Sequence, residues 1–210
     1  MKLNCNFTSP NPYIMSEFWI YFQTAWRHVL EVKNYNTILF LIAIAVPYSF
    51  KDWKRILLLF SILALGEIVA LLLSFVGIVI IKINLIEFLI PITILITACF
   101  NLFSVGKSNK GNGINLIGFF VLFFGIIHGL SFSNYFKSIL TGNLSVKILP
   151  LFEFAVGIQA VQILVILLVL IASYICQTFF RFSKRDFTLV FSSFVIGVVL
   201  PVIIENAIWK

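Results

Sequence analysis

Residues 114–140 read INLIGFFVLFFGIIHGLSFSNYFKSIL. The first two-thirds of this stretch is apolar and long enough to cross a bilayer, which takes about 20 residues. It nevertheless carries His128, flanked by Gly125 and Gly129. An ionisable side chain at membrane depth is costly unless it faces a partner or a cavity, so His128 is either a functional residue or a buried neutral histidine bonded to another helix. The two glycines lie on one helical face, and we expect another helix to approach closely there.

Composition places the whole chain in a membrane. Hydrophobic residues make up 61% of the sequence and charged residues only 11%, whereas a soluble domain is about 25% charged. The net charge of +7 comes from lysines and arginines in short loops between apolar runs. This pattern is typical of membrane orientation rather than of a nucleic-acid-binding face. The expected partner is therefore the lipid bilayer, with no nucleic acid.

Six apolar runs predict about six transmembrane helices. They cover residues 37–50, 55–81, 85–105, 114–140, 148–180 and 187–208. Residues 16–33 carry an aromatic stripe with charges on the other side, which favours an amphipathic helix lying in the membrane interface. The sequence thus predicts an all-α polytopic membrane helix bundle. Residues 1–36 form its N-terminal tail and interfacial helix, and residues 37–210 form the transmembrane bundle.

The loops predict an orientation. Those after the first, third and fifth apolar runs hold eight basic residues, namely Lys51, Lys54, Arg55, Lys107, Lys110, Arg181, Lys184 and Arg185. Basic loops stay on the cytoplasmic side, so both termini are expected outside. The first fifteen residues lack an apolar segment, and no cleavable signal peptide is expected. We expect a multi-pass protein of the bacterial inner membrane with periplasmic termini.

Enzyme and disulfide patterns are weak in this sequence. Cys5, Cys99 and Cys176 lie far apart and form no pair typical of a zinc site or a disulfide framework. His128 and Ser131 lie close together, as in a fragment of an intramembrane serine protease. However, a nucleophilic serine needs a base, and no histidine occurs in a later run. We therefore expect no enzyme.

Polar side chains within and before the apolar runs define a candidate metal site. They can converge in the middle and outer part of a bundle, and they are His128, Glu67, His28, Gln159, Asn36 and Gln162. A carboxylate, amides and imidazoles suit a borderline divalent metal such as nickel or zinc. They suit a purely structural hydrogen-bond network equally well, because polar side chains commonly join helices in lipid.

Five segments resemble the HupE/UreJ membrane proteins, a family associated with nickel uptake for hydrogenase and urease. The family's HGLGFA-type segment is similar to GIIHGLSFSNYFKSIL, and its histidine-containing helix with a following GYDH segment is similar to FWIYFQTAWRHVLEVKNYNTILFLIAI. Three more segments follow in the family's order and resemble ILALGEIVALLLS, IEFLIPITILITACFNL and FAVGIQAVQ. The resemblance covers nearly the whole chain and implies a permease for a transition metal of the nickel type.

The resemblance also shows where this chain departs from the family. Retained positions are His28, His128, Gly157 and Gln162. The family's Asp-His pair falls on Asn36 and Thr37, its second-span histidine on Glu67, its fifth-span glutamate on Gln159 and a preceding asparagine on Ala155. Two functions follow. One is a metal-ion permease or metal-handling protein whose only expected cofactor is a divalent metal ion. The other is a non-transporting structural or accessory subunit with membrane-protein partners or a homo-oligomeric state.

Overall fold

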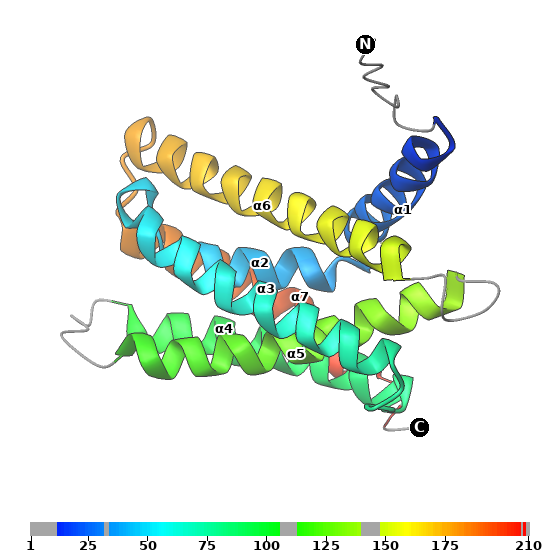
Figure 1. The fold of residues 1–210 in the computed structure, drawn as a ribbon. Helices are drawn as coiled ribbons and strands as arrows, with labels where there is room; N and C mark the ends of the chain where they lie inside the picture. Colours follow the sequence, from blue (N-terminus) through cyan, green and yellow to red (C-terminus); the bar gives the residue numbers. More distant parts are fainter. Residues whose placement is uncertain (1–11, 32–33, 106–112, 140–147, 207, 209–210) are drawn as a thin grey trace, which may run out of the picture.

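The described part of the chain is a bundle of helices. The computed structural model describes residues 12–31, 34–105, 113–139, 148–206 and 208, and no strand occurs among them. Its elements are α1 (Pro12–Leu30), α2 (Asn36–Ala45), the 3-10 helix η2 (Phe50–Asp52), α3 (Trp53–Phe75), α4 (Ile83–Ser104), α5 (Gly113–Ile139), α6 (Ile148–Thr178) and α7 (Lys184–Ile204) (Figure 1). The predicted all-α fold is confirmed.

Five segments of the described chain are long and apolar enough to cross a membrane, and they are Phe50–Phe75, Ile83–Ser104, Ile117–Ile139, Ile148–Thr178 and Lys184–Ile204. The first predicted span differs from these. It forms only α2, a helix of 10 residues, which is about 15 Å long and so covers about half of the hydrocarbon core. The expectation that residues 37–50 cross the bilayer as one helix is thus corrected to a half-length helix.

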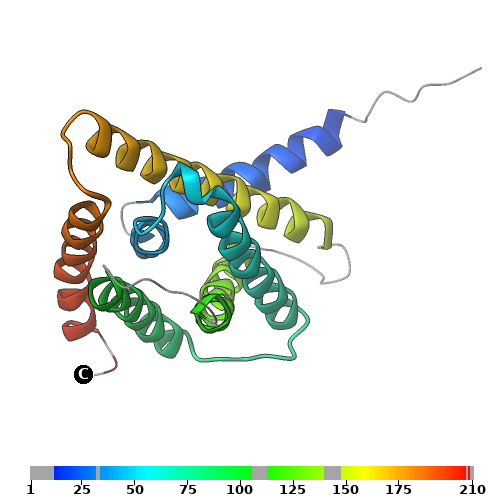
Figure 2. The ribbon, with the colours of Figure 1, turned by 90° about the vertical axis from the view of Figure 1, so that its left-hand side faces the viewer.

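Helix α2 lies at the centre of the bundle. Figure 2 shows it nearly end-on, with α3, α4, α5, α6 and α7 arranged around it. Seven of its ten residues are buried, namely Thr37, Leu39, Phe40, Leu41, Ala43, Ile44 and Ala45. A helix that is apolar on all sides is stable where other helices cover it. The short helix therefore forms part of the protein core instead of a lipid-facing span.

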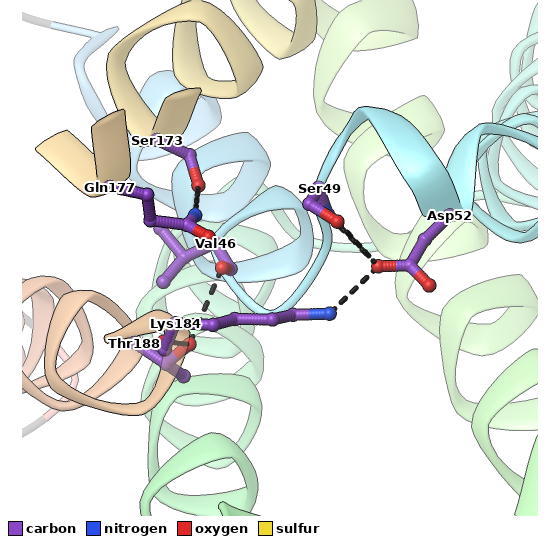
Figure 3. A network of polar contacts seen from close by, with 7 residues as sticks. All are labelled: Val46, Ser49, Asp52, Ser173, Gln177, Lys184 and Thr188. Atoms are coloured by element: carbon purple, nitrogen blue, oxygen red, sulfur yellow. Dashed lines mark hydrogen bonds and ion pairs between the residues drawn. The ribbon is translucent and has the colours of Figure 1, made fainter. Parts of the chain in front are cut away.

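Pro47 explains why α2 is short. Proline has no N–H, so the carbonyl of Ala43, four residues earlier, loses its helical donor. The side-chain amide of Asn101 on α4 replaces that donor and lies 2.7 Å from the Ala43 oxygen. The hydroxyl of Thr188 on α7 lies 3.4 Å from the Val46 oxygen (Figure 3). The Thr188 hydroxyl lies closer to the Lys184 carbonyl of its own helix, at 2.9 Å. Helix α4 thus satisfies the Ala43 carbonyl, whereas α7 only lies beside the Val46 carbonyl.

Glycines join α3 and α5 along a close seam. A Cβ added to Gly125 would lie 2.6 Å from the Leu63 oxygen, and one added to Gly66 would lie 2.6 Å from the Leu122 oxygen. Both distances are shorter than any normal contact, so only glycine permits this approach of the two backbones. The expected close approach of a helix at Gly125 and Gly129 is confirmed, and that helix is α3.

Helix α1 packs against α6 at another glycine. A Cβ added to Gly157 would lie 2.8 Å from the Cβ of Ala25. Ala25 and Val29 are fully buried, whereas Trp19 and Ile20 on other faces are more than half exposed. A helix is therefore present where the sequence predicts one, and it starts earlier than residue 16, at Pro12, whereas its position in the membrane interface stays a prediction.

The two ends of the bundle differ in charge. One end carries six described basic residues against two acidic ones, and the basic residues are Lys51, Lys54, Arg55, Arg181, Lys184 and Arg185. Both ends of the described chain lie at the opposite end of the bundle (Figure 1). Residues 12 and 208, the ends of the described chain, thus lie at the same end of the bundle, and the side of the membrane on which that end lies stays a prediction.

Candidate functional site

Glu67 is the centre of a buried polar cluster between α3 and α6. Its side chain is 2% exposed. The Gln162 amide donates to both carboxylate oxygens, at 2.8 and 3.0 Å, and the Gln159 amide donates to one of them at 2.9 Å. The two glutamines lie about one turn apart on α6, so they share a helical face. The structure brings together three of the six residues that the sequence singled out.

The carboxylate of Glu67 has no basic partner among the residues that the structure describes. The ion pair that the described residues contain joins Lys184 to Asp52 at the basic end of the bundle. A carboxylate at membrane depth without a cationic partner is costly, and amide donors offset only part of that cost. The surroundings of Glu67 therefore favour either a proton on the carboxyl group or a cation beside it.

Two oxygen atoms near Glu67 are free to accept an interaction. The side-chain oxygens of Gln159 and Gln162 are buried and lack a hydrogen-bond partner among the described residues. A cavity of about 10 Å³ adjoins Gln159 but not Gln162, and it is lined by Glu67, Ile68, Leu71, Phe132, Ala155, Ile158 and Gln159. This volume holds about one water molecule. Rotation of either amide exchanges its nitrogen and oxygen, so both glutamines can present oxygen or nitrogen to an occupant.

His128 lies in the interior but has other partners. It is 1% exposed, and its ring stacks on Phe40 of α2 with 4.2 Å between centroids. Its Nε2 lies 3.4 Å from the hydroxyl of Thr93 on α4. That hydroxyl donates to the Ile90 carbonyl, so Nε2 is the donor in this pair. Within the described residues no hydrogen bond joins His128 to Glu67. The two side chains therefore have separate sets of partners instead of forming the one cluster that the sequence predicted.

His28 lies beyond the Glu67 cluster, against the C-terminal part of α5. Its ring stacks on Tyr135 at 3.6 Å, and Nδ1 lies 3.1 Å from the amide nitrogen of Asn34. Burial lowers the pKa of His28 to about 4, so the ring is neutral at pH 7. Phe132 meets the His28 ring edge-on and also lines the cavity beside Glu67. Phe132 thus lies between the His28 ring and the cavity beside Glu67.

Asn36 begins α2 in the interior of the bundle. Its side-chain oxygen is buried and lacks a hydrogen-bond partner in the described part of the chain. Phe40, one turn later, stacks on His128, so the N-terminus of α2 lies within about one helical turn of the depth of His128. Sequence reasoning missed Thr93 and Asn34, whose only signal was a polar side chain in or beside an apolar run.

Comparison with known families now identifies the group. Residues 7–205 match the profile of a family described as HupE / UreJ protein. The chain belongs to the HupE/UreJ family. No curated protein and no solved structure gives a match. The resemblance carried by the five segments is therefore confirmed over nearly the whole chain, and this HupE/UreJ protein is a multi-pass membrane protein.

The donor set of this HupE/UreJ protein differs from that of a tight transition-metal site. No group of three or more His, Cys, Asp or Glu side chains that could hold a metal ion occurs among the described residues. The cluster instead offers one carboxylate, Glu67, and two amides, Gln159 and Gln162. Oxygen donors of this kind hold a transition metal less tightly than thiolate or several imidazoles.

Proposed function

We propose that this protein is a permease for a divalent transition-metal cation of the nickel type. The observation that carries the proposal is Glu67, a buried carboxylate with no basic partner among the described residues. An ionisable residue at membrane depth typically marks the path of an ion or proton. A divalent cargo cation would supply the positive charge that the surroundings of Glu67 lack.

The roles of the other residues follow from their positions. Rotation of the Gln159 and Gln162 amides would turn their oxygens toward a cation at Glu67. His128 faces Phe40 and Thr93 instead of Glu67, so it would offer a neutral ring nitrogen to the cation at a separate position along the path. His28 and Asn36 would belong to the approach from the end of the bundle that holds the termini. In this proposal the protein lies in the bacterial inner membrane, and that end faces the periplasm.

A second candidate function is supported by the same hydrogen bonds. Both oxygens of Glu67 already accept amide N–H groups, and such a network can simply fix α3 against α6. The protein would then be a structural or accessory subunit that contacts other membrane proteins or further copies of itself.

Metal binding and uptake separate the two functions. Purified protein is titrated with nickel and with zinc at micromolar concentration, and vesicles containing it are assayed for uptake of each ion. The proposal expects binding and uptake that Glu67→Gln abolishes while the variant still folds. The matched control is Glu87→Gln, because Glu87 is an exposed carboxylate on α4 and its loss should leave both measurements unchanged. Absence of binding and uptake for both metals rejects the permease and leaves the accessory subunit.

A further inference from the structure

A polar cavity opens at the basic end of the bundle. Its volume is about 300 Å³, and it is lined by Pro47, Asn101, Ser104, Val105, Lys184, Arg185 and Thr188. It therefore lies where the turn after α2, the end of α4 and the start of α7 meet. A cavity of this size is at the lower limit of small-ligand sites. The ends of the described chain lie at the opposite end of the bundle, so this cavity is remote from the proposed periplasmic approach.

The charged groups that line this cavity are cationic. Lys184 pairs with Asp52 at 2.7 Å, as Figure 3 shows, and Asp52 also accepts hydrogen bonds from Ser49. Arg185 is exposed and has no ion-pair partner among the described residues. The remaining carboxylate nearby, Asp186, is bound to Ser183 in the capping box of α7. The cavity thus presents a guanidinium that no carboxylate of the described chain neutralises.

The neutral polar side chains that line the cavity already donate hydrogen bonds to backbone carbonyls. Lys184 and Arg185 are therefore the groups expected to bind an anion. The Asn101 amide donates to the Ala43 carbonyl, the Ser104 hydroxyl to the Phe100 carbonyl and the Thr188 hydroxyl to the Lys184 carbonyl. Lys184 and Arg185 also occupy the first turn of α7, where the helix dipole is positive and basic side chains are unfavourable. An anion in the cavity would relieve this unfavourable placement, whereas a metal cation would be repelled.

We propose that this cavity binds the phosphate group of an anionic phospholipid. Arginine binds phosphate through two parallel N–H groups, and basic pockets between transmembrane helices hold acidic headgroups at the cytoplasmic surface. Apolar side chains beside the cavity would contact the acyl chains. Ile96, Phe100 and Phe103 on α4 and Val190 and Phe194 on α7 are all exposed, and these two helices pack side by side. Free phosphate shares the same chemistry and is the second ligand to be tested.

Native mass spectrometry of the full-length protein tests the proposal. The protein in detergent is mixed with phosphatidylglycerol or with phosphatidylcholine, and inorganic phosphate is titrated separately by calorimetry. Retention of phosphatidylglycerol should exceed that of phosphatidylcholine, and Arg185→Gln should lower it about fivefold. The control is Lys54→Gln, because Lys54 is an exposed basic residue at the same end that does not line the cavity, and it should change retention little.

Each outcome decides the lipid proposal. Binding of phosphatidylglycerol that depends on Arg185, without measurable binding of inorganic phosphate, supports it. Binding of inorganic phosphate that depends on Arg185 equally replaces the lipid with a soluble anion and overturns the lipid assignment. Equal retention of both lipids, or an equal loss in the Arg185→Gln and Lys54→Gln variants, overturns the site itself. Circular dichroism of each variant confirms that the helices are intact before the comparison is made.

Discussion

Gly129 on α5 lies directly against the backbone of Glu67 on α3. A Cβ added to Gly129 would lie 2.6 Å from the Cα of Glu67 and closer still to its carbonyl oxygen. Because the two backbones touch, neither helix can rotate without moving the other. The direction in which the Glu67 carboxylate leaves α3, toward Gln159 and Gln162, is therefore fixed by a glycine on a third helix.

Replacing Gly129 by alanine should push α3 and α5 apart. Overpacking of this kind costs about 1–3 kcal/mol, so the Gly129→Ala variant should unfold at a lower temperature than the wild type in detergent. The control is Gly197→Ala, since a Cβ at Gly197 meets nothing within 4 Å and alanine is the better helix former. Equal unfolding temperatures for the two variants would contradict the described seam.

The Glu67 and Gln162 side chains should be energetically coupled. Hydrogen bonds to a charged group contribute about 1.5–3 kcal/mol, so Gln162→Leu should lower the free energy of unfolding clearly when Glu67 is present. In the Glu67→Leu background the same change should have little effect, and a double-mutant cycle measures the difference. Gln177→Leu serves as the control, because the Gln177 amide bonds to Ser173 on its own helix. A coupling near zero would show that the bonds contribute nothing.

The cap on α2 allows a rescue experiment. Asn101→Leu should leave the Ala43 carbonyl without a donor and destabilise the protein by about 1–3 kcal/mol. Adding Pro47→Ala restores a backbone N–H at the position that normally bonds to that carbonyl. The double variant should therefore be more stable than Asn101→Leu alone. If Pro47→Ala lowers the stability of the Asn101→Leu variant further, proline is not the reason that the Ala43 carbonyl lacks a backbone hydrogen bond.

His28 should make stability depend on pH. Burial lowers its pKa to about 4 from about 6.5 in the unfolded chain, so the unfolded state takes up a proton first as pH falls. The contribution is fully present above pH 6.5 and decreases toward pH 4, by up to about 2 kcal/mol at pH 5. Unfolding temperatures at pH 7 and pH 5 should differ less in His28→Gln than in the wild type. An unchanged difference would mean that His28 is not the titrating group.

Cysteine labelling checks the proposed orientation. Lys82, before α4, and Lys54, at the start of α3, are exposed at opposite ends of the bundle. In a background without the natural cysteines, an impermeant reagent applied from outside should label Lys82→Cys and not Lys54→Cys. Labelling of both after the membrane is permeabilised shows that each site is reactive. The reverse pattern in intact cells would invert the orientation.

The long helices were predictable because apolar runs and basic loops mark membrane segments directly. The run at 148–180 became α6, Ile148–Thr178, and the run at 85–105 became α4, Ile83–Ser104. The half-length α2 was not predicted, since an apolar run does not show where a helix stops. Pro47 is visible in the sequence, but proline within a span is tolerated where neighbours satisfy the freed carbonyl. Only the structure shows that Asn101 does so at the end of the helix.

Part of the candidate site was predictable because the spacing and depth of polar residues can be read from the apolar runs. Gln159 and Gln162 share a face by spacing, and their depth matches that of Glu67. The separate position of His128 depends on how α5 is rotated about its axis, which the sequence does not show. Successive residues on a helix differ by about 100°, so once Gly129 faces α3, its neighbour His128 must turn elsewhere. It turns to Phe40 and Thr93.

The caps at the end of α2 have a consequence for how the protein is assembled. During synthesis α2 emerges before the helices that cover its C-terminal end, because Asn101 and Thr188 come about 60 and 140 residues later. At about 15 Å it is also too short to be held by lipid alone. The second helix of the chain should thus reach its final place last, when α7 has entered the membrane. Truncation before α7 would therefore leave the centre of the protein unassembled, although most of its spans would already be in place.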